Sequence, residues 1–151
     1  MGHYVQTAQV PASPERVFRA YTDPLMLADW MDMRAIRDQT GPLDRVGNEC
    51  TLVVRGPWWF RSSVRQCDPP RSITFGGAGR LGASFQVTAM LTPRDAGTWL
   101  EQRTDYTLPF GAFGRWLDQR FVEGRPRTVA DREFARLLAL VSEEDVRARA
   151  R

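Results

Sequence analysis

Two segments in the second half of the chain alternate apolar and polar positions with a period of two. Apolar residues fall at every second position of 81–91 and again at even positions of 98–108. A period of two is typical of a strand with one buried face. We therefore predict two strands joined by a turn at 93–97. The second strand puts Gln102, Thr104 and Tyr106 on its buried face, where polar groups need partners in the protein, in water or in a ligand.

The stretch 106–141 changes to the three-and-four spacing of a helix with one buried stripe. Its apolar positions are Phe113, Trp116, Leu117, Phe121, Ala130, Phe134, Leu137, Leu138 and Val141. Pro126 interrupts this pattern, because proline removes an intrahelical hydrogen bond and clashes with the preceding turn. We therefore predict a kink or break at 123–126 and two helical segments, the second restarting near Pro126. The second segment is expected to be plain core, and any binding specificity is expected on the first.

The N-terminal third predicts one strand and two short helices. A strand over 3–10 ends at Pro11, and Ser13 followed by Pro14 is a good helix start. Asp23 and Pro24 close that helix and open a second one, which carries Trp30 on its apolar face. A weak strand follows at 34–41.

Two further strands at 49–55 and 58–67 are predicted to form a hairpin around Gly56-Pro57. A two-residue turn would place Val53 on the same face as Trp58 and Phe60, with Leu52 and Val54 on the other face. A bulge or a longer turn is the alternative. With a short strand at 72–75, the order is strand, two helices, about six strands and one long helix. Strands and helices do not alternate, which argues against a parallel sheet.

The segment 77–82, GAGRLG, matches the G-x-G-x-x-G fingerprint of dinucleotide-binding proteins. That mechanism requires a helix after the glycines, because the helix N-terminus holds the pyrophosphate. The residues that follow have the period of a strand instead. We therefore interpret the glycines as a hairpin turn and predict no nucleotide site there.

The composition is that of an ordinary globular protein, with 151 residues, 42% hydrophobic and 26% charged. All 21 basic residues are Arg and are scattered along the chain, and the net charge is only +3, so no nucleic-acid-binding surface is predicted. No apolar run is long enough for a membrane span. The N-terminus lacks the pattern of a signal peptide, so we expect a cytoplasmic protein of one domain, 1–151.

The segment 10–30 and the segment from Leu108-Pro109-Phe110-Gly111 to Gly114 resemble the START-like (SRPBCC) superfamily. More narrowly, they are similar to its bacterial polyketide cyclase/dehydrase and lipid-transport branch. The resemblance implies an α+β helix-grip fold, a curved antiparallel sheet of about six or seven strands around a long C-terminal helix. It also implies a cavity that holds a lipid, polyketide or quinone-like molecule.

A cavity of this kind would be lined by aromatic and polar residues from both halves of the chain. The candidate ligand-binding residues are Trp30, Trp58, Phe60, Phe75, Phe85, Gln102, Thr104, Tyr106, Trp116, Arg120 and Phe121. Trp58 and Phe60 could equally be core. Arg120 could bind a ligand carboxylate or phenolate, or could lay its stem over Trp116 on the surface.

The residue types needed for nucleophilic or metal catalysis are sparse. His3 is the only histidine, which excludes a Ser-His-Asp triad and a multi-histidine metal site. Cys50 and Cys67 have no histidine partner and are predicted to be reduced, buried thiols. Asp29 and Asp32 flank Trp30, as acids at a pocket edge or as a solvated helix end. We predict no catalytic residue, cofactor or metal.

Three functions remain open on these observations. The first is a binder of a hydrophobic small molecule, present as a monomer or homodimer. The second is a polyketide aromatase/cyclase in which Tyr106 or Arg120 polarises carbonyl groups. The third is a module that docks a protein or the ribosome. The sequence favours the binder over the enzyme.

Overall fold

A computed structural model describes residues 2–54, 58–109 and 125–149, and the side chains of the C-terminal helix over 128–142. The described residues form one seven-stranded antiparallel sheet and four helical segments. In chain order these are β1 (Gly2–Val10), α1 (Pro14–Thr22), α2 (Pro24–Trp30), β2 (Met33–Arg37), β3 (Glu49–Val54), β4 (Trp59–Asp68), β5 (Ser72–Gly79), the 3₁₀ turn η1 (Arg80–Gly82), β6 (Ser84–Arg94), β7 (Gly97–Thr107) and α4 (Arg125–Arg149).

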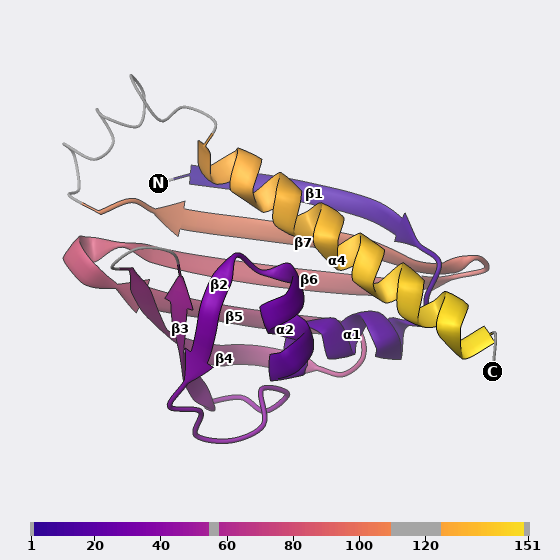
Figure 1. Cartoon of the computed structure of the whole chain (residues 1–151), viewed down its shortest axis with the longest axis horizontal. Helices are drawn as coiled ribbons and strands as arrows, with labels where there is room; N and C mark the ends of the chain where they lie inside the picture. The colour runs from indigo at the N-terminus through magenta and orange to yellow at the C-terminus, as the bar shows by residue number, and fades with distance from the viewer. Residues whose placement is uncertain (1, 55–57, 110–124, 150–151) are drawn as a thin grey trace.

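The sheet is a meander of hairpins closed on one side by the N-terminal strand. The strand order is β1-β7-β6-β5-β4-β3-β2, so β1 and β7, which are far apart in sequence, lie side by side. Figure 1 shows α1, α2 and α4 on the same face of this sheet, with α4 running obliquely across β1 and β7. The side chains of one sheet face therefore point toward the helices.

The two N-terminal helices begin and end where local chemistry specifies. The Ser13 hydroxyl accepts a hydrogen bond from the Arg16 N–H at 3.4 Å, and Pro14 occupies the first helical position. Asp23 ends α1 and caps α2, because its carboxylate accepts a hydrogen bond from the Leu25 N–H at 2.9 Å. These contacts confirm the predicted helix boundaries and turn the chain so that both helices cover the sheet.

The core lies between the helices and the sheet. Its most deeply buried large side chains are Val10, Val17, Tyr21, Trp30, Leu52, Ile73, Leu100, Leu137 and Val141. Burying an aliphatic or aromatic side chain of this size contributes about 1.5–3 kcal/mol each. The second half of α4 supplies Phe134, Leu137 and Val141 to this cluster, which confirms that this half is core.

The β3–β4 hairpin has the longer of the two turns considered from the sequence. Leu52 pairs with Phe60, and the Val54 N–H donates to the Trp58 carbonyl at 3.1 Å, so three residues, 55–57, connect the paired positions. The two-residue turn is therefore wrong. Because of the extra residue, Leu52 and Val54 share a face with Trp58 and Phe60.

The segment GAGRLG differs from its predicted role as a turn. Gly77 and Gly79 lie inside β5, and the turn is formed by η1, where Leu81 and Gly82 have positive φ angles of 58° and 81°. A strand follows, as predicted, so no helix N-terminus is present to hold a pyrophosphate. The turn predicted at 93–97 is also shorter, because Arg94 and Gly97 still pair in the sheet.

The C-terminal helix agrees with the prediction over the part that the structure describes. α4 occupies Arg125–Arg149, with Pro126 in its first turn, where a proline lacks no helical hydrogen bond. The predicted break at 123–126 and the first helical segment, with Trp116, Arg120 and Phe121, lie outside the described residues in whole or in part. The overall arrangement is the predicted α+β helix-grip fold.

Candidate ligand-binding cavity

A cavity of about 530 Å³ lies between the sheet, the end of α2 and the first turns of α4. One wall is apolar and comes from β3, β4 and β6 with the residue before β4: Leu52, Val54, Trp58, Phe60, Phe85 and Val87. The other wall is more polar and comes from β1, β7 and α4: Tyr4, Gln102, Thr104, Tyr106, Thr107 and Glu133. The remaining described lining residues are Trp30, Met31, Ala83, Ser84, Leu108, Pro109, Val129 and Ala130.

The apolar wall is built around two rings that meet across β5. Phe60 and Phe85 lie edge to face with centroids 5.3 Å apart, although their strands are separated by β5. The residues of β5 paired with them are Gly79 and Gly77. A Cβ at Gly77 would come within 3.0 Å of the Phe85 ring, and one at Gly79 within 3.0 Å of the Phe60 ring. The glycines therefore leave room for the two rings.

The polar wall is held together by a chain of side-chain hydrogen bonds. The buried Tyr21 hydroxyl donates to Gln102 Oε1 at 2.6 Å, and Gln102 Nε2 donates to Gln6 Oε1 at 3.3 Å. Gln6 Nε2 donates in turn to Asp131 Oδ1 at 2.8 Å. Both polar ends of Gln102 thus find partners within the protein, which satisfies one of the polar groups predicted on the buried face of β7.

Tyr4 and Tyr106 lie together at the edge of the cavity formed by β1 and β7. Their ring centroids are 6.0 Å apart, and Tyr4 pairs with Thr104 across the two strands. Burial raises the pKa of Tyr4 to about 12, against an opposing hydrogen bond with the Thr104 side chain. The Tyr4 hydroxyl is therefore neutral at physiological pH and can donate as well as accept a hydrogen bond.

Glu133 brings a carboxyl group to the cavity wall from the third turn of α4. Its Oε1 accepts a hydrogen bond from the Asp32 backbone N–H at 2.7 Å, which ties the helix to the segment after α2. Burial raises the pKa of Glu133, and the Asp32 carboxylate adds to the rise. The Asp32 N–H and the Arg136 guanidinium oppose it.

Trp30 is fixed at the end of α2 by two contacts. Its Nε1–H donates to the Ala20 carbonyl at 2.8 Å, and its ring lies edge-on to Tyr21 at 5.3 Å. Only 2% of Trp30 is exposed. One part of this large side chain is therefore core, and another part lines the cavity.

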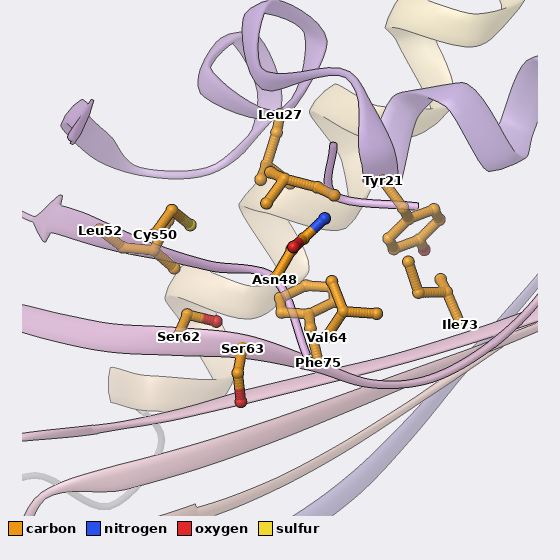
Figure 2. Close-up of a pocket in the computed structure, with 11 residues that line it drawn as sticks. Tyr21, Leu27, Asn48, Cys50, Leu52, Ser62, Ser63, Val64, Ile73 and Phe75 are labelled. Carbon is orange, nitrogen blue, oxygen red and sulfur yellow. The ribbon is translucent and has the colours of Figure 1, made fainter. Parts of the chain in front are cut away.

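A second, much smaller cavity lies deeper between the helices and the sheet. Figure 2 shows Tyr21 and Leu27 of the helices facing Val64, Ile73 and Phe75 of the sheet. Its volume of about 20 Å³ accommodates roughly one water molecule. It is too small for an organic ligand.

Seven of the candidate residues line the large cavity: Trp30, Trp58, Phe60, Phe85, Gln102, Thr104 and Tyr106. Phe75 lies against the small cavity instead, with its ring 6.1 Å from that of Phe85, because it occupies a position of β5 closer to α1. Trp116, Arg120 and Phe121 are outside the described residues. The expectation that specificity lies on the first helical segment is incomplete, because Val129, Ala130 and Glu133 of the second segment also line the cavity.

Tyr4 and Glu133 are lining residues that the sequence reasoning missed. Tyr4 occupies an even position of β1, and the even positions of this strand are the less exposed ones. Glu133 is three residues after Ala130 and four before Leu137, so it lies on the edge of the helix stripe. Both signals were present in the spacing, but an acidic residue and a short N-terminal strand gave no reason to expect a cavity there.

The other chemically notable side chains lie away from this cavity. Asp29 is exposed, and His3 is exposed with its Nδ1 at 2.7 Å from Asp105 Oδ1. Cys50 lines the small cavity, and the Cys67 thiol donates to the Asp44 carbonyl at 3.1 Å. Burial raises the pKa of both thiols. Within 2–54, 58–109 and 125–149, no three His, Cys, Asp or Glu side chains are grouped to hold a metal ion.

A curved antiparallel sheet, with helices on one face and a cavity beneath the C-terminal helix, defines the helix-grip class of proteins. The chain belongs to the polyketide cyclase/dehydrase and lipid transport family, whose model matches residues 1–142. This confirms the resemblance to the START-like superfamily. No helix in the described part of the chain is long and apolar enough to cross a membrane.

Solved structures share this fold at low sequence identity. Protein MLL2253 from Mesorhizobium loti is 20% identical with a TM-score of 0.73, over 94% of this chain and 98% of its own. TTHA0849 from Thermus thermophilus is 18% identical with a TM-score of 0.70, over 97% and 99%. DynU16, from the dynemicin biosynthetic locus, is 20% identical with a TM-score of 0.61, over 91% of this chain and 46% of its own. No curated protein matches the sequence.

Proposed function

We propose that this protein binds a hydrophobic small molecule in the cavity between the sheet and α4. The observation that supports this most directly is the cavity itself, about 530 Å³ in volume with one wall of aromatic and aliphatic side chains. Ligand pockets in proteins are typically about 300–1,000 Å³ and mostly apolar, with a few placed polar groups. The Phe60–Phe85 pair offers a large apolar contact area to a ligand.

The hydrogen bonding of the polar wall favours binding over catalysis. Gln102 is used by Tyr21 and Gln6, so it stabilises the protein and is not held ready for a reacting group. Cys50 and Cys67 do not line the cavity, and their raised pKa values disfavour the reactive thiolate.

A cyclase-type reaction is the second candidate, because Tyr4, Tyr106 and Glu133 bring hydroxyl and carboxyl groups to one side of the same cavity. Such groups could polarise carbonyls of a poly-β-ketone held in a folded conformation. The family description and the biosynthetic locus of DynU16 are compatible with this chemistry. Turnover of a poly-β-ketone that is lost in Tyr106→Phe supports this candidate, whereas no turnover by the wild type removes it.

Filling the cavity tests the binding proposal. Ala130 is 4% exposed and lines the cavity, whereas Ala135 is exposed on the same helix. Ala130→Leu and Ala135→Leu therefore add the same atoms inside and outside the cavity. We expect the uncharged fluorescent probe N-phenyl-1-naphthylamine to bind the wild type and Ala135→Leu equally, and Ala130→Leu at least about tenfold more weakly.

A second pair approaches the cavity from the sheet, in case the helix does not tolerate the larger residue. Val87→Phe adds volume to the apolar wall, and Val5→Phe adds it at an exposed position of β1. Circular dichroism establishes that each variant is folded. A probe that fails to bind the wild type, or that binds folded cavity and surface variants alike, contradicts the proposal.

A further inference from the structure

The two walls of the cavity differ in chemistry along the order of the strands. Leu52, Phe60 and Phe85 come from β3, β4 and β6, toward one side of the sheet. Tyr4 and Thr104 come from β1 and β7, at the other edge, where α4 packs against β1. A molecule that fills the cavity therefore meets apolar groups at one end and hydrogen-bonding groups at the other.

Glu133 is the one charged residue among the described lining residues, and it lies at the polar end. The Asp32 N–H donates to one of its oxygens at 2.7 Å and thereby fixes the side chain. A carboxylate has about four acceptor sites, so this single bond leaves it capacity to accept from a ligand. As an acceptor it favours a ligand group that donates a hydrogen bond.

The charges around Glu133 are predominantly negative. Asp32 and Asp131 bring two more carboxylates close to the polar end, and Arg136 brings one positive charge from the exposed face of α4. Tyr4 is neutral. Because burial weakens solvent screening, a second anion placed beside Glu133 is strongly disfavoured.

We propose that the cavity selects uncharged ligands whose polar end donates a hydrogen bond, such as a hydroxyl group, and discriminates against carboxylates of the same size. This selectivity rests on the proposed binding function. Glu133 enforces it by accepting from the hydroxyl and by repelling the anion. Tyr4 and Thr104 supply further hydroxyl groups for the same polar end.

Displacement of N-phenyl-1-naphthylamine by decanol and by decanoate tests the selectivity with two ligands of equal chain length. At about pH 8, above the ordinary carboxyl range, both Glu133 and decanoate are ionised. We expect decanol to bind at least about tenfold more tightly than decanoate to the wild type. Decylammonium has the opposite charge and is expected to bind more tightly than decanoate.

Glu133→Gln isolates the carboxylate, because the glutamine oxygen can still accept from the Asp32 N–H. In this variant we expect the preference for decanol to shrink to less than about threefold, mainly through tighter binding of decanoate. Asp131→Asn is the matched control. It removes the same charge from an exposed position on the same helix, and its amide oxygen can still accept from Gln6. It is expected to keep the wild-type preference.

The outcomes separate this inference from the binding proposal. If neither the probe nor any decyl compound binds, the proposed function itself fails. If decanol and decanoate bind the wild type equally, or if Glu133→Gln leaves the preference unchanged, the inference is overturned and the binding function stands. Tighter binding of decanoate that is lost in Arg120→Gln would also overturn it, in favour of the carboxylate anchor considered from the sequence.

Discussion

The hydrogen bond between Tyr21 and Gln102 should be one of the most consequential polar contacts in the protein. Tyr21 is 2% exposed and Gln102 is 4% exposed, and their side chains are 2.6 Å apart. Burial also raises the pKa of Tyr21, which keeps its hydroxyl protonated and able to donate. Tyr21→Phe removes that donor with little change in shape and leaves the Gln102 oxygen without its partner.

The expected loss follows from the cost of an unpaired buried acceptor. Leaving such a group unsatisfied costs about 1–3 kcal/mol, more than the net value of an average hydrogen bond. For a protein of this size each kcal/mol lowers Tm by about 2–4 °C, so Tyr21→Phe should lower it by roughly 2–12 °C. Urea unfolding followed by circular dichroism measures the free energy, and a thermal melt measures Tm.

A double-mutant cycle with Gln102→Leu separates the pair from the effect of each residue alone. Removing both partners leaves neither of them unpaired, so the double variant should be more stable than the sum of the two single losses by about 1–2 kcal/mol. A loss below about 0.5 kcal/mol in Tyr21→Phe would refute the reasoning. It would mean that water in the adjoining cavity reaches the Gln102 oxygen, and that the pair is not isolated from solvent.

Three further changes have distinct expected outcomes. Ala130→Leu buries about two to three additional carbon groups in empty space and should raise the free energy of unfolding by about 1–2 kcal/mol in a urea titration; a loss would show that Ala130 is already tightly packed. Because the pKa of Glu133 is raised on folding, wild-type stability should fall as the pH rises from the ordinary carboxyl value through the raised one. The stability of Glu133→Gln relative to wild type should therefore increase over that interval, and a constant difference between about pH 4 and 8 would contradict the shift. Gly97→Ala should cost more than about 3 kcal/mol, since Gly97 has φ 136° and a Cβ there collides with the Val10 carbonyl, whereas Gly82→Ala, with φ 81° and open space, should cost only about 1–2 kcal/mol in the same melts.

The sequence predicted the elements whose signals are local. The caps at Ser13 and Asp23 act within a few residues, so their pattern identifies both helix starts without any knowledge of the tertiary structure. The even positions of β7 were placed on the buried face for the same reason, since alternation is a property of the strand alone. These features were enough to predict the fold class.

The features that were missed depend on neighbouring strands. Gly77 and Gly79 looked like turn residues, but they are strand residues whose missing side chains make room for Phe85 and Phe60. The length of the β3–β4 connection was left open because alternation fits either register when both faces carry apolar residues. No local pattern contains this information.

The candidate site was predicted in part for a related reason. Aromatic residues such as Phe60 and Phe85 line a cavity and a core with the same spacing, so their selection was correct without revealing which they would do. Glu133 was overlooked because acidic residues on a helix are usually solvated. Its contact with the Asp32 N–H joins residues about a hundred positions apart, and the chain order gives no hint of it.

The described part of α4 is held in two different ways along its length. Near its start, Asp131 and Glu133 accept single hydrogen bonds from Gln6 and the Asp32 N–H, each contributing about 0.5–3 kcal/mol. Farther along, Leu137 and Val141 are fully buried and contribute about 1.5–3 kcal/mol each through apolar contact, in addition to Phe134. Had the first turns been packed by large apolar side chains as well, they would occupy the space where the cavity now lies. Polar attachment at one end and apolar packing at the other therefore allow a single helix both to complete the core and to cover the cavity.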